Sequence, residues 1–583
     1  MVADYLPVDE QHRTVGLFGM VVMGFFWVCG GMYGNEELLG TAPPLLVLSA
    51  LVIVPLCHSL PVSMMIAECG TAWPADGGLP VFVQRAFGDT IGGYNTIFTW
   101  LNCLVDAAIY PVMAASYTKE LFSQTDERLV CVAIVTLMTA MQLGGLDCIV
   151  RFSALLLLLS LTPTVVFTLF GAGYVSSATL LVSEGPRHPT LLLSFVFWLD
   201  SGFYSLADIA GEVKNPGRVM PLACLILQPM NMLINLLPLT VALSLDSNAA
   251  HYTSGTGYFS TLATRVGGRW LGKAFFCASM VSNLGNYSSQ VVSAEKLSAF
   301  FIESQLGAVA GADAPSWKQA RLPCAGLYGR ISPLRLGAYL CSRSEASGQQ
   351  PCVIVFNACC ILALILCFQL EALIELVAFI MTINMTLFLL AFVQLRRAEP
   401  HTPRPFRLPG GQASLCFAVL SPLCFIFANL YILLAERDQG AARLAFLLAV
   451  VGVGALLQRL YRRLAPADTT TPVSYHVPGP AAKAASASLL RFLALGFALS
   501  CLLVGSSTLG RPGLPPARPP PPPPPPPSPP PCKALGVAKH ARPKSPKVKH
   551  AVAPNLKASS MGVRRATAHE GVGAWVARRK LPA

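Results

Sequence analysis

The chain has 583 residues, of which 54% are hydrophobic and only 12% are charged; its mean hydropathy is +0.56 and its formal net charge is +13. Because ordinary soluble domains carry roughly 25% charged residues, this composition excludes a large soluble core. A run of about 20 mostly apolar residues is long enough to cross the hydrocarbon region of a bilayer. Such runs recur from Val15 to about Tyr461. The sequence therefore predicts an all-α polytopic membrane protein.

The chain begins with a polar, mildly acidic segment, residues 1–14. It lacks the charged, apolar and small-residue order of a cleavable signal peptide. We therefore expect a cytosolic N-terminal segment, followed by a first span that acts as its own insertion signal.

Twelve spans are predicted in the apolar core, residues 15–463. Most Lys and Arg residues in the gaps between them fall on the side that holds the N-terminus, so both ends of the core are expected to face the cytosol. The predicted spans cover residues 15–38, 44–67, 91–118, 128–146, 150–174, 190–210, 219–245, 271–301, 352–369, 372–395, 413–435 and 441–461.

The first span is interrupted by CGGMYGNEE, residues 29–37. Gly30, Gly31 and Gly34 weaken a helix, so the backbone is expected to unwind there. An unwound backbone is tolerated at membrane depth only where it is buried in protein or lines a cavity. The freed N–H and carbonyl groups are those that transporters with broken helices use to hold charged substrates.

The sixth span, FWLDSGFYSLADIAGEVKNPGRVMP, is interrupted in a corresponding way at Ser201–Gly202. Asp200 and Asp208 flank this break. Spans one and six occupy corresponding positions in two five-helix halves. Paired interruptions of this kind are the best sequence-level pointer to the binding site of an inverted-repeat transporter.

Beyond the core, a linker (464–488) leads to an extra hydrophobic segment, 489–509, which contains Arg491. Transmembrane, re-entrant and interfacial placements of this segment all remain open. Residues 510–583 combine a proline run with a basic, aromatic-poor tail, which predicts an extended, disordered segment. Its lysines and arginines favour contact with anionic lipid, and no nucleic-acid partner is expected.

Four stretches, in order along the chain, resemble one family. SGFYSLADIAGEVKNPGRVMP is similar to the sixth helix of amino acid–polyamine–organocation permeases, which ends in E-x-x-NP. The similarity to the polyamine/H+ symporter branch of plants and protozoa is carried by three further stretches: CGGMYGNEE, SLPVSMMIAECGTAWPADGGLPVF (59–82) and WLNCLVDAAIYPVM (100–113). This resemblance implies a leucine-transporter-type fold, a 5+5 inverted repeat plus two further helices, in which helices one, three, six and eight enclose the substrate.

A polyamine carries several ammonium groups and no carboxylate, so its site needs spaced anionic points with apolar surface between them. The core offers Glu36 at the first break, Asp106 within span three and Asp200 at the second break. Ionisable residues inside a span are costly and usually mark a pathway. Asp208 lies deeper in span six and is expected to pair with a polar group elsewhere.

Aromatic and polar neighbours complete the predicted substrate site. Tyr110 follows Asp106 by one helical turn and shares its face. Trp198 and Tyr204 are expected to provide aromatic walls, since rings attract ammonium groups. The family often places an acid where this chain has Tyr204, and span eight contributes the polar Asn286. The full set of predicted substrate-binding residues is Gly30, Gly31, Gly34, Glu36, Asp106, Tyr110, Trp198, Asp200, Ser201, Gly202, Tyr204 and Asn286.

The resemblance implies a proton as the coupling ion, with Asp106 and Glu68 as its candidate carriers; Glu68 is also a candidate brace for the loop after span two. No metal-ligand motif, nucleophile elbow or phosphate loop occurs, so no catalytic residue, metal or organic cofactor is predicted. The leading interpretation is a proton-coupled importer of putrescine- or spermidine-class polyamines in the plasma membrane. The alternatives are a cationic or neutral amino-acid permease and a nutrient sensor that binds such ligands.

Overall fold

The computed structural model describes residues 13–122, 124–185, 188–252, 257–306, 344 and 349–435. Their regular structure is helical, apart from an isolated β-bridge between Val15 and Val213. Most of the predicted N-terminal segment, the span at 441–461, the linker, the hydrophobic segment at 489–509 and the tail at 510–583 lie outside the described residues.

The first predicted span is two helices separated by a turn. Helix α1 (Leu17–Val28) ends where the glycines begin, and α2 (Glu36–Thr41) starts after a non-helical stretch. The second span is longer than predicted and contains a wide turn. It runs as α3 (Pro44–Val54), the π-helical η2 (Pro55–Ser59) and α4 (Leu60–Ala72). Proline cannot donate the usual helical hydrogen bond, which accounts for the local change of helix type at Pro55.

The second predicted break is also present. Helix α10 (Pro189–Leu199) ends at the residue before Asp200, and the chain continues as two 3₁₀ turns, η4 (Gly202–Ala207) and η5 (Ala210–Glu212). The next long helix, α11 (Pro216–Leu245), begins at a proline, which is preorganised for a helix start.

The remaining predicted spans within the described residues are helices whose ends differ from the predictions by a few residues. They are α6 (Asp89–Leu121), α7 (Glu127–Gln142), α8 (Leu146–Gly171), α14 (Arg269–Leu306), α16 (Pro351–Cys367), α17 (Leu370–Ala398) and α18 (Gly411–Ala435). The predicted span 150–174 ends in the 3₁₀ turn η3 (Ala172–Tyr174). Short connecting helices that were not predicted are α5 (Leu79–Phe87), α9 (Ser177–Leu180), α12 (Ala249–Tyr252) and α13 (Tyr258–Gly267).

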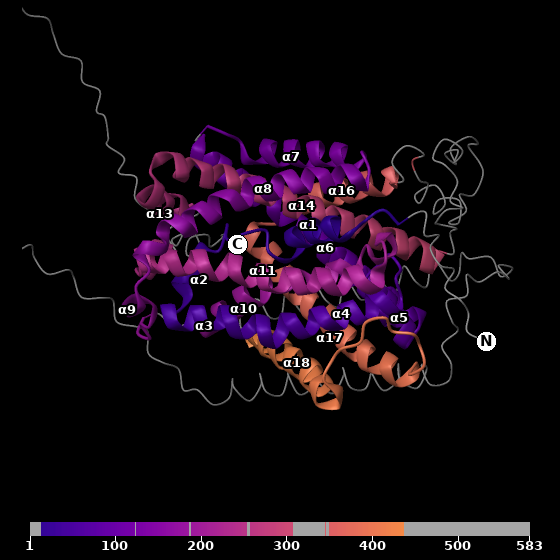
Figure 1. The fold of residues 1–583 in the computed structure, drawn as a ribbon. Helices are drawn as coiled ribbons and strands as arrows, with labels where there is room; N and C mark the ends of the chain where they lie inside the picture. The colour runs from indigo at the N-terminus through magenta and orange to yellow at the C-terminus, as the bar shows by residue number, and fades with distance from the viewer. Residues whose placement is uncertain are drawn as a thin grey trace, which may run out of the picture. The chain divides into compact units, whose positions relative to one another are not determined.

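The interrupted helix α1 lies inside the bundle (Figure 1). It contacts α8, α11, α14 and η4, and its residues Met20, Met23 and Phe25 are completely buried. Helix α14 packs along α6 over much of its length. The two breaks are therefore enclosed by other helices, so their polar backbone is shielded from lipid.

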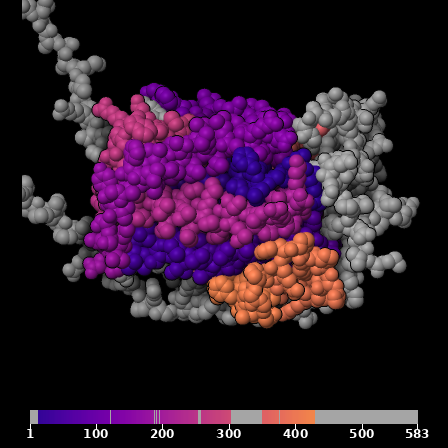
Figure 2. All heavy atoms as spheres, in the orientation of Figure 1, coloured from indigo at the N-terminus to yellow at the C-terminus, as the bar shows by residue number. Residues whose placement is uncertain are grey.

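The outward surfaces of the long helices are apolar. Within the described residues, six helical stretches are long and apolar enough to cross a membrane. Large exposed hydrophobic side chains lie on α8, as Leu158 and Leu169, and on α11, as Leu225 and Leu233. Figure 2 shows α11 on this face between the indigo α3–α4 helices and the purple α7–α8 helices. Exposed apolar surface of this extent is typical of contact with lipid.

Candidate functional site

The first break is a glycine turn held against α14. Gly30, Gly31 and Gly34 have φ values of 63°, 105° and 86°, which residues with a β-carbon rarely adopt. The hydroxyl of Ser282 donates a hydrogen bond to the carbonyl of Gly30. A β-carbon on Gly30 would lie 2.5 Å from the side-chain amide of Asn286. Glycine is thus required both by the backbone conformation and by the approach of α14.

The second break packs directly on the first. A β-carbon on Gly202 would overlap the backbone carbonyl of Trp27, at the end of α1. The Ser201 hydroxyl turns back and donates to the carbonyl of Trp198 at 2.8 Å. The two interruptions therefore form a single unit.

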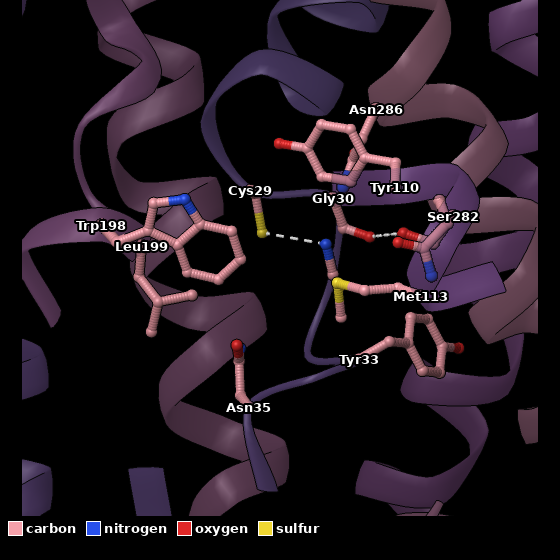
Figure 3. A pocket seen from close by; sticks show the side chains of 12 residues that line it. Cys29, Gly30, Tyr33, Asn35, Tyr110, Met113, Trp198, Leu199, Ser282 and Asn286 are labelled. Carbon is pink, nitrogen blue, oxygen red and sulfur yellow. Dashed lines mark hydrogen bonds between the residues drawn. The ribbon is translucent and has the colours of Figure 1, made fainter. Parts of the chain in front are cut away.

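Two adjoining pockets lie at this junction and share Cys29, Tyr110, Trp198, Leu199 and Asn286 among their walls. Figure 3 shows the first pocket, with Trp198 and Tyr33 on either side of the unwound Cys29–Gly30 backbone. The other residues that line the first pocket are Gly30, Gly31, Tyr33, Asn35, Met113, Ser282 and Asn283. Those that line the second are Phe26, Trp27, Val28, Asp106, Ser201, Gly202, Tyr204, Gln290, Val377 and Met381.

Asp106 provides the only carboxylate among the described residues that line these pockets. Tyr110 donates to it at 3.2 Å, and the side-chain amide of Gln290 donates at 2.5 Å. None of the lining residues is Lys, Arg or His. The carboxylate is thus oriented by neutral donors and has no basic partner in the pocket walls.

Hydrogen-bond acceptors without a partner also line the two pockets. The side-chain oxygens of Asn286 and Gln290 are buried and accept no hydrogen bond from the described residues. Buried polar atoms normally have partners. Two neutral oxygens and one carboxylate together form a set of acceptors suited to a ligand rich in donors.

Nine of the twelve predicted substrate-binding residues line one or both pockets: Gly30, Gly31, Asp106, Tyr110, Trp198, Ser201, Gly202, Tyr204 and Asn286. Gly34, Glu36 and Asp200 line neither. Gly34 faces Met113 instead.

Both acids at the breaks are used within the protein. Glu36 is buried at the start of α2 and accepts a hydrogen bond from the backbone N–H of Gly257 at 3.3 Å. Asp200 accepts from Asn231 at 2.8 Å, and Asn231 and Asn235 link it along α11 to Asn35 at the first break. These contacts brace the two breaks, and substrate contact by Glu36 and Asp200 stays a prediction.

Glu68, the second proton-carrier candidate, is held in an ionic network. Its fully buried carboxylate contacts the guanidinium groups of Arg396 and Arg404, the latter at 2.8 Å, and accepts from the backbone N–H of Leu408 at 2.8 Å. Two fixed cations favour the ionised carboxylate. These contacts make Glu68 a brace between α4, the end of α17 and the chain that follows α17, whereas the sequence suggested a brace for the loop after span two.

We expect Glu68→Gln to destabilise the protein strongly, because it leaves the charges of Arg396 and Arg404 without their buried partner. Removing one partner of a buried ion pair costs about 3–5 kcal/mol. The midpoint of thermal unfolding in detergent measures this effect, with Glu127→Gln as the control, since Glu127 is a half-exposed partner of Lys119. An unchanged midpoint in Glu68→Gln would contradict the brace interpretation.

The sequence pattern alone did not identify Gln290 as a partner of Asp106. A signal was present, because Ser282, Asn286 and Gln290 recur every four residues along α14. This spacing places them on one helical face, the face that lines the pockets. Cys29, Tyr33 and Asn35 were also missed, because non-helical backbone has no periodicity from which side-chain directions can be predicted.

Comparisons with known proteins agree with this architecture. A family model described as amino acid permease matches residues 14–307, half of the chain. The chain is 28% identical to polyamine transporter PUT1 of Oryza sativa subsp. japonica over 468 residues, which cover 78% of this chain and 80% of that protein. It is 25% identical to polyamine transporter RMV1 of Arabidopsis thaliana over 465 residues, which cover 77% of this chain and 85% of the relative.

The matched region contains both helix breaks, Asp106 and the polar face of α14, so the likeness extends over the whole candidate site. Together with the apolar helices, it makes the protein a multi-pass membrane transporter. The chain belongs to the amino acid permease family of the amino acid–polyamine–organocation superfamily.

Proposed function

We propose that this transporter imports polyamines of the putrescine and spermidine class by proton symport and alternating access. The observation that carries the proposal is that, among the described residues lining the two pockets, Asp106 is the only acid and none is basic. A substrate with a carboxylate would lack a cationic partner there. The printed names of the relatives, polyamine transporters, support the same substrate class.

The walls offer binding groups for both ends of a diammonium ligand. One ammonium group would replace Tyr110 and Gln290 as a partner of Asp106 and gain a charge-assisted hydrogen bond. An ammonium group carries three donors, which matches the unpartnered oxygens of Asn286 and Gln290. Trp198 and Tyr110 border both pockets, where their rings would cover the methylene chain and attract the ammonium groups.

The two breaks supply the movable parts. Because α1 and α10 both stop at the pocket, the segments on either side of it are free to tilt separately, as alternating access in inverted-repeat transporters requires. The contact between Gly202 and Trp27 couples these movements. The orientation proposed is an N-terminus in the cytosol of a cell whose plasma membrane holds the transporter.

Uptake measurements test the substrate class. Cells deficient in polyamine uptake that express the protein should accumulate labelled putrescine, and unlabelled spermidine should compete strongly while arginine and leucine compete weakly. A protonophore should abolish accumulation, and a more acidic external medium should raise it. Arginine displacing the label better than putrescine does would overturn the polyamine assignment.

Amino-acid transport is the second candidate, favoured by the description of the matching family. The unwound backbone at the first break is the kind of structure that binds a substrate carboxylate in related folds. Direct uptake of labelled arginine and leucine by the same cells separates the two functions. For the nutrient-sensor alternative, deletion of residues 464–583 should leave accumulation intact if the protein is a transporter.

A further inference from the structure

Asp208 is another buried acid that lies outside both pockets. Asp208 follows η4 on the segment beyond the second break, and its side chain is fully buried. Neither carboxyl oxygen has a hydrogen-bond partner among the described residues. The hydroxyls of Ser205 and Ser293 lie close enough to interact with the carboxyl group, although neither forms a regular hydrogen bond with it. Asp208 is therefore a buried acid whose polar neighbours are two hydroxyls, and no ion pair to it is present among the described residues.

The charged groups around Asp208 do not neutralise it. Asp76, in the turn between α4 and α5, lies close enough to repel the Asp208 carboxylate, and α6 contributes the thiol of Cys103. On α14, Lys296 lies one turn from Ser293, but its ammonium group contacts Asp76 at 2.9 Å and Glu212 at 2.6 Å. A cation already shared by two carboxylates offers little compensation to a third.

The remaining ionisable groups on the elements packed against Asp208 do not neutralise its charge either. Tyr204 precedes Asp208 on the broken segment and is neutral as a phenol, and Glu68 on α4 is neutralised by Arg396 and Arg404. Burying an isolated carboxylate costs far more free energy than burying a neutral carboxyl group. The surroundings of Asp208 thus favour the protonated form as long as the site stays closed.

A loop closes the site. The backbone N–H of Gly77 donates to the carbonyl of Asp208 at 3.1 Å, and a β-carbon on Gly78 would overlap the Asp208 carboxyl group. The same loop carries Asp76, which accepts from the N–H of Gly211 at 2.9 Å. Lys296 therefore clamps this loop to the segment after η4, near the end of the bundle where Val15 pairs with Val213.

We propose that Asp208 carries the coupled proton, while Asp106 binds the substrate ammonium group. This inference rests on the proposed function. With the site open to the outside, the Asp208 carboxylate takes a proton from water and forms an O–H bond. When the clamp of Asp76, Glu212 and Lys296 opens towards the cytosol, water reaches the carboxyl group, accepts the proton and restores the carboxylate.

The segment that follows the second break links substrate binding at Asp106 to proton binding at Asp208. Tyr204 lines the second pocket, and its hydroxyl accepts a hydrogen bond from Asn102 at 2.9 Å. Asp208 follows one turn later on the same segment, so substrate at Asp106 and a proton at Asp208 act on one movable element. Ligands that bias the same two states are thermodynamically coupled.

Purified protein in liposomes tests the assignment through two assays. Counterflow of labelled putrescine against internal putrescine needs binding and alternating access but no net proton movement, whereas accumulation driven by a pH gradient needs both. Asp208→Asn should keep counterflow near the wild-type rate and lower gradient-driven accumulation by about tenfold or more. Asp106→Asn should lose both activities, and the exposed Asp147→Asn neither.

The outcomes separate the two proposals. Absence of putrescine counterflow in the wild type would overturn the proposed function itself. Normal counterflow in the wild type combined with full gradient-driven accumulation in Asp208→Asn would overturn only the assignment of Asp208. Accumulation driven by a sodium gradient, or loss of proton coupling with intact counterflow in Asp106→Asn, would also overturn it.

A second measurement on the wild type covers the case in which Asp208→Asn fails to fold. Dicyclohexylcarbodiimide reacts with protonated carboxyl groups in apolar surroundings, and peptide mass spectrometry locates the adduct. We expect an adduct on Asp208 that diminishes as the pH rises and that parallels the loss of gradient-driven uptake. Inhibition without an adduct on Asp208 would contradict the proposal.

Discussion

Gly202→Ala is expected to abolish transport and to lower thermal stability, because its β-carbon would overlap the carbonyl of Trp27. The obstacle is backbone at the end of α1, which cannot turn aside as a flexible side chain can. Overpacking a well-packed interior lowers the free energy of unfolding by about 1–3 kcal/mol and occasionally more. Because the overlap is with backbone, we expect Gly202→Ala to lie at the upper end of this range. The break itself would be displaced, since Gly202 opens η4 and lines the second pocket.

Gly173→Ala is the matched control for this substitution. Gly173 lies in a 3₁₀ turn after α8, and a β-carbon there would meet nothing within 4 Å. Both variants should be compared by putrescine uptake and by the midpoint of thermal unfolding in detergent. Wild-type uptake in Gly202→Ala would show that the two breaks need not be in contact during transport.

Asp106→Asn is expected to lower polyamine uptake severely while the amount of protein at the cell surface stays near normal. Asparagine has almost the same volume and keeps an oxygen that Tyr110 and Gln290 can reach. What it lacks is the charge that would pair with the substrate. Removing one partner of a buried charge pair costs about 2–5 kcal/mol, or at least roughly 30-fold in affinity.

Uptake kinetics and surface biotinylation measure this effect, and the exposed Asp147→Asn provides the same chemical change away from the pockets. The expected loss should appear chiefly as a raised KM for putrescine. Unchanged uptake in Asp106→Asn would remove this residue from the substrate site, and with it the main physical reason for proposing a cationic substrate.

The helix interruptions could be predicted from sequence because their cause is local. Glycines with positive φ stop α1 directly after Val28, and Ser201–Gly202 follows the end of α10. Hydrophobic runs likewise located the long helices to within a few residues. Short connecting helices such as α5 and α13 were not predicted, since they lie in segments that are too polar or too short to be recognised as membrane spans from hydropathy.

The roles of the buried acids could not be predicted, because they depend on groups far away in the sequence. Asp200 is held by Asn231 on the following helix, and Glu68 by arginines more than 300 positions later. Glu36 accepts a hydrogen bond from the backbone N–H of Gly257. Sequence patterns show that an acid lies in a span, whereas its partner is decided by how the helices pack.

An experimental map of the protein with bound spermidine would locate the substrate relative to the two helix breaks. We expect elongated density between the unwound Cys29–Gly31 backbone and Ser201–Gly202, with one ammonium group beside Asp106 and the methylene chain against Trp198. Helices that continue unbroken through residues 29–35 and 200–202, or ligand density away from this junction, would contradict it.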